Sequence, residues 1–434
     1  MASQRPVESH HRCRASRRRG DDRVSAHDHV ASAHGVVRAP DAIHFGRGAR
    51  ASLAAAVAEL GGRALVVVDP FLATTDSFAE SLAALEGAGV TVRVHADVVP
   101  ELPVDDVVAA AEAARGWRPD VVVAYGGGSA LDLGKLVALL LSQPGPLSDY
   151  YGENRVRGPV LPIVAVPTTA GTGSEATPVA VVSDPERELK VGVSDAALVP
   201  RVAIVDPDLT TGVPARVTAY SGIDAIVHCA ESFTAVRREP VWAERLPIFV
   251  GRNRMSALFA LDGLWAMGGA LPRAVADGAD REAREQMAWG SLLGGLAFGS
   301  GGTHLSHALQ YPIGAMTHTP HGLGTGLMLP YVLQACRAET SPQLAEMAVA
   351  LDVASGSEAD DAQAAIDRLA EICHAIGLPA SLADLGVTRA QLPRIAQLAA
   401  GVTRLAALAS REATPDLLER ILDAAYDGDR SRLV

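Results

Sequence analysis

Cysteine is scarce in this chain, and its four cysteines, Cys13, Cys229, Cys336 and Cys373, form no CxxC pair. This spacing excludes a disulfide framework and a zinc ribbon, and it fits a reducing cytoplasm. Positive charge is also in deficit, because 38 basic residues face 50 acidic ones; the net charge of −12 argues against nucleic acid as a partner. No apolar run approaches the roughly 20 residues of a membrane-spanning helix. With 434 residues, the chain is long enough for two domains.

The first 35 residues lack apolar periodicity and carry six arginines within the first 19 positions. We predict a disordered tail over residues 1–35. Three consecutive arginines at 17–19 could indicate a twin-arginine export signal, but no apolar segment follows them. The histidines of this region have polar neighbours, and we expect them to be exposed and not to bind metal: His10, His11, His27, His29 and His34.

Strand and helix patterns alternate from residue 62 onward. Short apolar runs predict buried strands at 64–68, 91–95, 120–125, 161–166, 178–183 and 202–205. Amphipathic, alanine-rich stretches predict helices at about 75–86, at 104–114 and from Ser129. Such alternation is typical of parallel strands with helices on both faces. We therefore predict a doubly wound α/β nucleotide-binding domain over residues 36–209.

Three glycines, at 126–128, connect the strand at 120–125 to the helix that opens at Ser129. Glycine lets the backbone approach a phosphate, and the free N–H groups of a helix N-terminus attract an anion. Gly127, Gly128 and Ser129 are thus candidate nucleotide-binding residues, although such a turn can also be purely structural. The fingerprint GxGxxG is missing after the first strand, so an ordinary Rossmann assignment would be wrong in detail.

Three further features follow strands of this domain. Asp69 ends the first strand of the alternation, where a carboxylate can accept hydrogen bonds from ribose hydroxyls and repel a 2′-phosphate. This position of Asp69 favours NAD over NADP as the cofactor. The alternative is that Asp69 only forms an Asp-Pro turn. The loop at 167–175 offers four hydroxyls and two glycines at the end of the sheet where ligands bind. Lys190 lies in an expected hairpin, either as a ribose or phosphate contact or as surface charge.

Strand patterns disappear beyond residue 209, and alanine- and leucine-rich helical segments follow. We predict an all-helical domain over residues 210–434. Its helices are expected to be interrupted at Pro272, Gly278, Gly356, Gly377 and Gly386.

Histidines concentrate in residues 301–322, among glycine and apolar side chains: His304, His307, His318 and His321. Buried imidazoles need partners, which makes a metal ion the first hypothesis. Asp224 and His228 stand at i and i+4 of the domain's first helix and share a face. With His307 and His321 they would form an Asp-plus-three-His site, whereas His304 is not expected to be a ligand. Each histidine alone could equally be a core residue with satisfied hydrogen bonds.

Four motifs in this order resemble the iron-containing (group III) alcohol dehydrogenase family: GGGSALDLGK, PTTAGTGSEAT, GIDAIVHCAE and HALQYPIGAMTHTPHG. The resemblance covers about residues 36–430 and implies an NAD(P)-binding α/β domain, an all-helical metal-binding domain and an active site between them. It implies a divalent metal, Fe²⁺ or Zn²⁺, with the ligands Asp224, His228, His307 and His321. The cofactor-binding motifs of the family fall on Asp69, Gly127, Gly128, Ser129, Asp132, Thr168, Thr169 and Lys190.

The implied reaction is hydride transfer between nicotinamide C4 and an alcohol or aldehyde carbon whose oxygen is polarised by the metal. Members of the family often have a second histidine four residues after the third ligand, and here that place is Tyr311. Tyr311 and His318 are therefore the candidates for carrying the alcohol proton to solvent. We expect a small-molecule alcohol or aldehyde substrate, no nucleic acid or membrane partner, and a cytoplasmic homodimer.

The segment at 240–255 looks longer and more basic than is usual in the family. Arg252 and Arg254 follow a glycine there, and guanidinium groups suit bidentate contact with carboxylate or phosphonate. These arginines predict an anionic substrate, with a surface loop or a subunit contact as an equally good interpretation.

Three alternatives remain open. Dehydroquinate synthase-like lyases share the superfold but depend on clustered lysines and a glutamate ligand, whereas lysines are few here. A non-catalytic metal-binding protein is disfavoured because cofactor motifs accompany the ligands. Maleylacetate reductases lack the metal, and the four ligand positions disfavour them.

Overall fold

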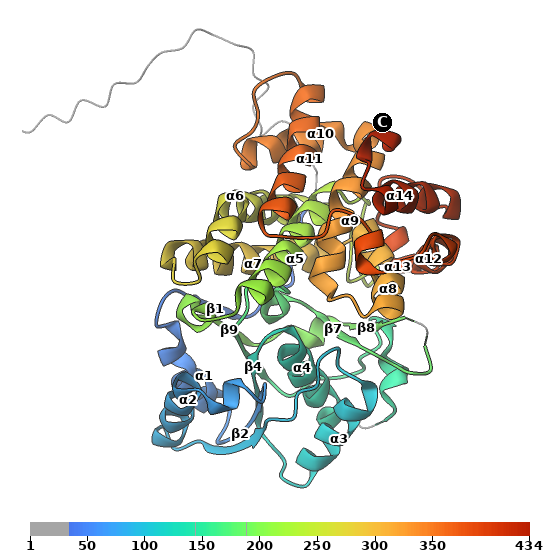
Figure 1. The fold of residues 1–434 in the computed structure, drawn as a ribbon. Helices are drawn as coiled ribbons and strands as arrows, with labels where there is room; N and C mark the ends of the chain where they lie inside the picture. Colours follow the sequence, from blue (N-terminus) through green and yellow to red (C-terminus); the bar gives the residue numbers. More distant parts are fainter. Residues whose placement is uncertain (1–33, 144, 188) are drawn as a thin grey trace, which may run out of the picture.

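The computed structural model describes residues 34–143, 145–187 and 189–434. The predicted disordered tail, with His10, His11, His27 and His29, lies outside these residues except for its last two positions. The chain forms an α/β half and a helical half, one stacked on the other (Figure 1). None of the described helices combines the length and the hydropathy that a bilayer span requires.

Six parallel strands form the central sheet, in the order β1-β9-β6-β4-β2-β3. The middle strands β2, β4 and β6 are buried along nearly their whole length, as expected for a sheet covered on both faces. The strands are β1 (Ala42–Phe45), β2 (Arg63–Val68), β3 (Thr91–His95), β4 (Val121–Gly126), β6 (Ile163–Pro167) and β9 (Val202–Val205).

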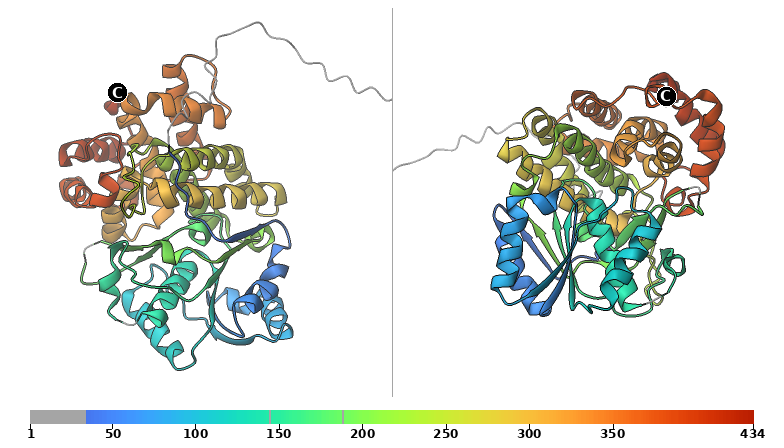
Figure 2. Two further views of the ribbon diagram at one scale, coloured as in Figure 1. Left: turned by 180° about the vertical axis from the view of Figure 1, so that it is seen from behind. Right: turned by 60° about the horizontal axis from the view of Figure 1, so that its bottom comes forward.

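Helices cover both faces of this sheet. In β2, Val66 packs into the cluster that includes α1 (Leu53–Leu60) and α2 (Asp76–Gly87). Leu65 faces the opposite cluster, which includes α3 (Val104–Arg115) and α4 (Gly128–Ser142). The two layers of helices are visible on either side of the sheet in Figure 2. The predicted doubly wound α/β fold followed by helices is confirmed.

The strand predicted at 178–183 lies outside the central sheet. It forms β7 (Val179–Val182), which pairs antiparallel with β8 (Val191–Ser194) in a three-stranded sheet completed by β5 (Gly152–Glu153). A connection as short as 183–190 can join antiparallel strands but not parallel ones, which need a crossover. The hairpin expected around Lys190 is therefore present, and it separates β7 from the parallel sheet.

All later α-helices belong to the helical half: α5 (Ala215–Thr234), α6 (Arg254–Ala276), α7 (Arg281–Gly301), α8 (Leu305–Thr317), α9 (His321–Ala335), α10 (Arg337–Ala350), α11 (Glu358–Ala375), α12 (Leu392–Ala400), α13 (Thr403–Ala406) and α14 (Pro415–Asp427). The expected interruption at Pro272 is wrong, because α6 continues past it. A proline leaves the carbonyl four residues earlier without its helical donor. Here Arg368 Nη2 donates to that carbonyl, Gly268 O, at 3.2 Å. The four expected glycine interruptions do lie between helices.

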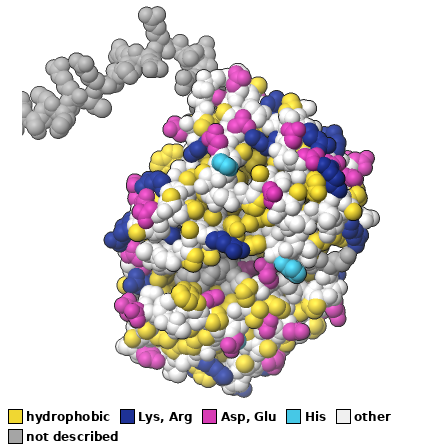
Figure 3. All heavy atoms as spheres, viewed as in Figure 1, with side chains coloured by type: hydrophobic (Ala, Val, Ile, Leu, Met, Phe, Trp, Pro, Cys, Tyr) yellow, Lys and Arg dark blue, Asp and Glu magenta, His cyan; other side chains and the backbone are white. Residues whose placement is uncertain are grey.

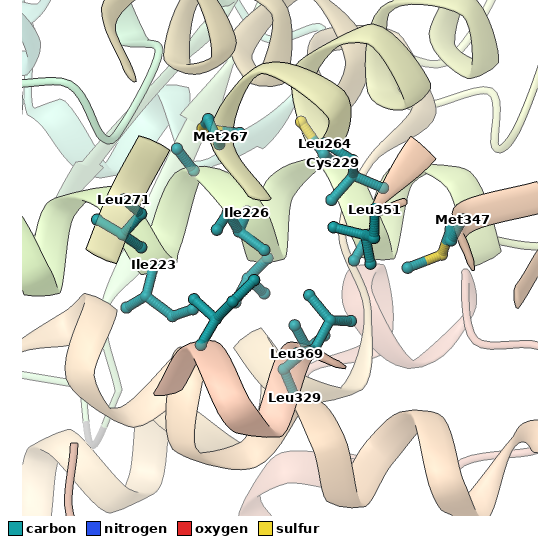
Figure 4. Packing of buried hydrophobic residues seen from close by; sticks show 14 of the residues in the cluster. Ile223, Ile226, Cys229, Leu264, Met267, Leu271, Leu329, Met347, Leu351 and Leu369 are labelled. Atoms are coloured by element: carbon teal, nitrogen blue, oxygen red, sulfur yellow. The ribbon is translucent and has the colours of Figure 1, made fainter. Parts of the chain in front are cut away.

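The core of the helical half forms around α5 (Figure 4). Ile223 and Ile226 of α5 are fully buried among leucine and methionine side chains of α6, α9, α10 and α11. Asp224, His228 and Glu231 of the same helix are also buried, although they are polar. Because buried polar groups must be paired, this second face of α5 needs partners of its own.

Residues 34–38 run along the helical half rather than forming a solvated arm. Val36 N donates to Asn253 Oδ1 at 3.2 Å, and Arg38 Nη1 donates to Ile248 O at 2.8 Å. The expected exposure of His34 is wrong, because it is only 6% exposed and its ring centroid lies 6.3 Å from that of Trp242. Its polar sequence neighbours conceal this burial, which residues more than 200 positions away create. The predicted domain boundaries, at residues 35/36 and 209/210, stay predictions.

Candidate active site between the two halves

Four side chains from three helices meet at the polar face of α5. Asp224 Oδ2 lies 3.7 Å from His228 Nε2, one turn further along the helix. His307 of α8 and His321 of α9 present Nε2 to the other carboxylate oxygen, Asp224 Oδ1, at 3.9 and 3.7 Å. These separations exceed hydrogen-bond lengths. The predicted residues are therefore brought together without bonding directly to one another.

The turn between α8 and α9 carries His321 back to α5. His318 adopts a left-handed conformation with φ of 54° at the end of α8, and Pro320 precedes the first residue of α9. A Cβ on Gly322 would lie 2.0 Å from Tyr220 O of α5. Only glycine permits this approach, so Gly322 lets α9 begin directly against α5.

Two imidazoles of this group, those of His228 and His321, are neutral at physiological pH. Burial lowers the pKa of His228 to about 4 and that of His321 to about 3. Burial by itself would raise the pKa of Asp224, but the neighbouring imidazoles and the Thr325 hydroxyl, which donates to Oδ1 at 2.8 Å, hold it below its ordinary value. A carboxylate thus faces imidazoles that are not cations. Such a set offers negative charge and lone pairs, which is what a metal ion requires.

Glu231, fully buried two turns after Asp224 on α5, fixes the orientation of His307. Its Oε2 accepts hydrogen bonds from His307 Nδ1 at 2.7 Å and His304 N at 2.8 Å, and its Oε1 accepts from Ser306 N at 2.6 Å. Burial favours the neutral acid, but His304 and His307 hold the pKa of Glu231 well below its usual range. Because a carboxylate only accepts, His307 carries its proton on Nδ1 and its lone pair on Nε2. That Nε2 is buried and has no hydrogen-bond partner among the described residues.

Both ring nitrogens of His304 are already hydrogen-bonded within the protein. Its Nδ1 accepts a hydrogen bond from Leu305 N at 2.8 Å, and its Nε2 lies 2.9 Å from Thr234 Oγ1. The Thr234 hydroxyl itself donates to Ala230 O at 2.7 Å, so His304 Nε2 must be the donor in that pair. His304 is thus a structural residue that caps the N-terminus of α8.

The residues fit a divalent metal. One donor atom each from Asp224, His307 and His321 lies within 4.8 Å of the others, and His228 Nε2 borders the same carboxylate. Ligands in a tetrahedral site with bonds of about 2.1 Å are about 3.4 Å apart, close to the separations found here. The unpartnered Nε2 of His307 and the neutral imidazoles of His228 and His321 also fit, because a metal ion needs nitrogen ligands with a free lone pair. His321 has the most exposed of these side chains, at 30%, and marks the open side of the group.

A cavity of about 200 Å³ joins this group to the N-terminus of α4. Gly128, Ser129 and Asp132 line its α/β side, and Phe298 and Tyr311 line its helical side. One face of the molecule is hollowed where the halves meet, with basic, acidic and histidine side chains at the rim (Figure 3). The cavity thus opens between the two halves of the chain.

The glycine-rich turn is built for close approach. Gly126 has a φ of +154°, and a Cβ there would lie 2.7 Å from Ala130 Cβ. A Cβ on Gly128 would lie 2.6 Å from Thr172 Cγ2. Among the described residues no side chain caps the N-terminus of α4, whose first residues, Gly128 and Ser129, line the cavity. Thr172, in the middle of the PTTAGTGSEAT loop, therefore lies against the start of α4.

The other candidate cofactor-binding residues differ in how many of their side-chain polar atoms already have partners within the protein. Asp132 has both oxygens occupied, accepting from Ser174 Oγ at 2.6 Å and Val181 N at 2.9 Å. Lys190 lines the cavity but forms an ion pair with Glu101. Asp69 Oδ1 accepts a hydrogen bond from Phe71 N at 2.8 Å, which is the Asp-Pro turn given above as the alternative to ribose binding. This hydrogen bond leaves Asp69 Oδ2 available to a ligand.

The two threonines after β6 lie beside the glycine turn. Thr168 is buried, and its backbone N donates to Gly126 O at 3.0 Å. Thr169 stands next to Gly127, where an added Cβ would lie 3.4 Å from Thr169 Oγ1. The backbone of Thr168 thus holds the turn against the end of the sheet, and Thr169 lies beside it.

A second cavity, of about 430 Å³, shares Tyr311, His321, Lys190 and Glu101 with the first. His318 lines this second cavity and not the first. The ring centroids of Tyr311 and His321 are 6.2 Å apart. Tyr311 thus stands between the metal-type group and the space that His318 borders.

The two arginines expected to select an anionic substrate lie elsewhere. Arg252 lies near Glu346 of α10, and Arg254 is exposed at the start of α6. Neither of them lines the cavity, so that prediction is wrong in its residues. The sequence interpretation missed Arg404 of α13, which does line the cavity, and Glu231. Glu231 was detectable from its heptad spacing to Asp224 on one helix.

Comparison with known proteins now decides the family. Residues 40–207 match the iron-containing alcohol dehydrogenase family, and residues 218–426 match the C-terminal domain of the Fe-containing alcohol dehydrogenase family. The chain belongs to the iron-containing alcohol dehydrogenase family. It is accordingly an oxidoreductase of the class that acts on CH–OH groups, in a family defined by a divalent metal.

Three relatives illustrate the range of this family. Long-chain-alcohol dehydrogenase 1 of Geobacillus thermodenitrificans (strain NG80-2) is 35% identical over 395 residues, 90% of this chain and 96% of the relative. The crystal structure of a 1,3-propanediol oxidoreductase superposes with a TM-score of 0.83 at 29% identity, covering 91% of this chain and 100% of the other. Sulfoacetaldehyde reductase from Bifidobacterium kashiwanohense, in complex with NAD+, gives a TM-score of 0.77 at 29% identity, with 91% and 99% coverage.

Proposed function

We propose that this chain interconverts a small alcohol and its aldehyde with NAD(H), using a divalent ion, Fe²⁺ or Zn²⁺, held by Asp224, His228, His307 and His321. One observation carries the proposal: the same cavity is lined by these four residues and by the start of α4. A cofactor bound along the glycine turn and a substrate bound at the histidines would meet inside it. A non-catalytic metal-binding protein would have no use for this junction.

When bound, the ion would polarise the substrate oxygen and the nicotinamide would carry the hydride. The residues of the chain orient and shield these partners. Phe298 stacks on the His228 ring at 4.3 Å between centroids, and with Leu102 and Val179 it gives the cavity apolar walls that exclude water. The uncapped N-terminus of α4 offers N–H groups to the cofactor phosphates.

Tyr311 and His318 are the proposed route for the alcohol proton. The Tyr311 hydroxyl lies between the two cavities and has no hydrogen-bond partner in the described part of the chain, so it is available to the substrate oxygen or to water. His318 borders the larger second cavity, through which the proton would reach solvent.

Asp69 supports NAD over NADP. The parallel register pairs Val68 with Tyr125, which sets Asp69 beside Gly126 at the end of the sheet. A ribose bound next to the glycine turn would meet Asp69 Oδ2, whose negative charge repels a 2′-phosphate. We expect Asp69→Gly to raise kcat/KM for NADPH at least 10-fold while lowering that for NADH, measured by steady-state kinetics. A wild-type enzyme that uses both cofactors equally would contradict this role.

The compartment and the oligomer are parts of the same proposal. Cys229, Cys336 and Cys373 are buried free thiols, which suits a reducing cytoplasm. Leu258 and Trp265 stand seven residues apart on one face of α6, each 63% exposed. Large exposed apolar side chains favour a protein contact, and a homodimer would cover them.

The test of the proposed function combines metal analysis with a cofactor assay on one preparation. Purified enzyme loaded with Fe²⁺ or Zn²⁺ should oxidise NADH in the presence of short aldehydes, and a chelator should abolish this activity. Enzyme that holds one ion per chain but oxidises no NADH with any aldehyde would favour the non-catalytic alternative.

A further inference from the structure

Arg404 is a cation in the cavity that catalysis, as proposed above, does not use. It lies on α13, which packs against α8, the helix that carries His307. Its side chain lines the same cavity as Asp224, His228, His307 and His321. The guanidinium carbon is 4.8 Å from the centroid of the Phe249 ring. A ring on one side leaves the in-plane N–H donors of the guanidinium directed away from it.

The charges around the cavity leave Arg404 without a counter-ion. The other cation in the lining, Lys190, pairs with Glu101. Asp132 is occupied by Ser174 and Val181. Among the described residues, Arg404 forms no ion pair, and no hydrogen bond from its guanidinium to the protein is present. A half-buried guanidinium with free donors beside a reaction site is poised for an anion from outside the protein.

We propose that Arg404 binds the anionic end of a short aldehyde substrate, such as a carboxylate or a sulfonate, while the aldehyde end reaches the Asp224–His228–His307–His321 group. This inference rests on the proposed function, because it names the substrate class for that site. The cavity has a volume of only about 200 Å³, so the substrate is short. Thr303, buried in the same lining immediately before His304, adds a hydroxyl that can donate to the anion.

The alternative role for Arg404 is structural, as a guanidinium that only packs on Phe249. Arg389 offers a control for a structural role: its guanidinium carbon lies 4.5 Å from the Tyr426 ring centroid, it pairs with Asp423 and Asp427, and it lines no part of the cavity. A purely structural arginine would affect all substrates alike. An anion receptor would affect charged substrates alone.

The experiment uses pairs of aldehydes that match in shape and differ in charge. Sulfoacetaldehyde is compared with 3,3-dimethylbutanal, and succinic semialdehyde with 4-methylpentanal, on the metal-loaded enzyme with NADH. We expect wild type to favour the anionic member of at least one pair, and the two pairs distinguish sulfonate from carboxylate. Arg404→Gln should raise KM for the anionic member about 10- to 100-fold while changing that of the neutral member less than about 2-fold. Arg404→Lys should restore part of the loss, and Arg389→Gln should change neither.

A calorimetric titration provides a readout that does not depend on turnover. The wild-type enzyme with NADH is titrated with the alcohol 2-hydroxyethanesulfonate, which cannot react with the reduced cofactor, and binding should weaken at least 10-fold in Arg404→Gln. Equal losses for charged and neutral aldehydes, or unchanged binding of the sulfonate, would overturn the role of Arg404 while leaving the dehydrogenase proposal in place. Arg404-dependent binding of the anion without any NADH oxidation would instead support the receptor and contradict the proposed function.

Discussion

His304 and His307 lie three residues apart and are both buried, yet their ring nitrogens have different partners. Both nitrogens of His304 are used by Leu305 and Thr234. His307 gives only Nδ1 to Glu231, and its Nε2, 3.9 Å from Asp224 Oδ1, has no hydrogen-bond partner among the described residues. The chemistry of each histidine is therefore set by one or two neighbouring polar atoms rather than by burial itself.

Tyr311 provides a prediction at this scale. Tyr311→Phe should lower kcat about 10- to 100-fold, because the phenolic hydroxyl is the proposed first carrier of the alcohol proton. The variant should also shift the pH dependence of kcat and retain one ion per chain, since Tyr311 is not among the ligand residues. Steady-state kinetics across pH and metal analysis check both points. Loss of the metal in this variant would show that Tyr311 acts on the ligand set instead.

Residue roles were only partly predictable from the sequence. Asp224, His228, His307 and His321 stood out because polar residues recur in otherwise apolar helices, and the structure brings them together. Arg404 did not stand out, because nothing local distinguishes an arginine that faces a cavity from one on the surface. Only the packing of α13 against α8 gives it that position.

The loop between β6 and β7 joins the two halves through a contact of glycine on glycine. Gly173, with φ of +60°, lies against Gly295 of α7, and a Cβ on Gly295 would be 2.4 Å from Gly173 O. We expect Gly295→Ala to lower the free energy of unfolding by about 1–3 kcal/mol, because neither backbone can move away without shifting α7 or the loop. Urea unfolding measures this directly.

Gly269 of α6 is the matched control. It is an exposed helical glycine with no atom within 4 Å of an added Cβ. Gly269→Ala should raise stability by about 0.5–1 kcal/mol through helix propensity alone. Equal effects of the two substitutions would contradict the close approach of the loop to α7.

The loop between β6 and β7 also contains a carboxyl group, that of Glu175, whose ionisation is coupled to the stability of the fold. Burial raises the pKa of Glu175 from 4.5 to about 7, despite the opposing charge of Lys135. The native state thus binds the Glu175 proton more tightly than the unfolded chain does. The protonated carboxyl group therefore adds to the free energy of unfolding below about pH 4.5, and this stabilisation is lost as the pH rises through 7. Relative to Glu175→Gln, wild type should lose up to about 3 kcal/mol of stability between pH 4.5 and 8. Denaturant unfolding of both proteins at the two pH values tests this, and parallel pH profiles would refute it.

At the scale of elements, periodicity predicted most helices and strands but not their partners. The run at 178–183 was recognised as a strand, yet only the short link to β8 determines that it leaves the parallel sheet. Pro272 was expected to end a helix, and α6 tolerates it because Arg368, nearly 100 residues later, satisfies the freed carbonyl. Such compensations depend on contacts between distant parts of the chain, which a local pattern does not contain.

Across the whole molecule, the site exists only where the halves meet. The α/β half contributes the start of α4 and the β7–β8 hairpin, and the helical half contributes the four ligand-type residues and Arg404. Residues 34–38, although they begin the α/β half, are bound to the helical half by Val36 and Arg38. The order of motifs along the chain indicated a site between the two halves. That residues 34–38 are bound to the helical half became apparent only from the fold.

The most direct test of the account is the metal content of His307→Ala beside that of His304→Asn, measured by elemental analysis of the purified proteins. His307→Ala removes the one buried imidazole nitrogen that is held ready by Glu231, so it should bind far less than one ion per chain and lose turnover. His304→Asn should keep one ion per chain and show only a lower melting temperature, because it removes hydrogen bonds to Leu305 and Thr234 and the 3.2 Å contact with Glu231 but leaves the hydrogen bond between Glu231 and His307 in place. Full metal occupancy in His307→Ala would contradict the site described here.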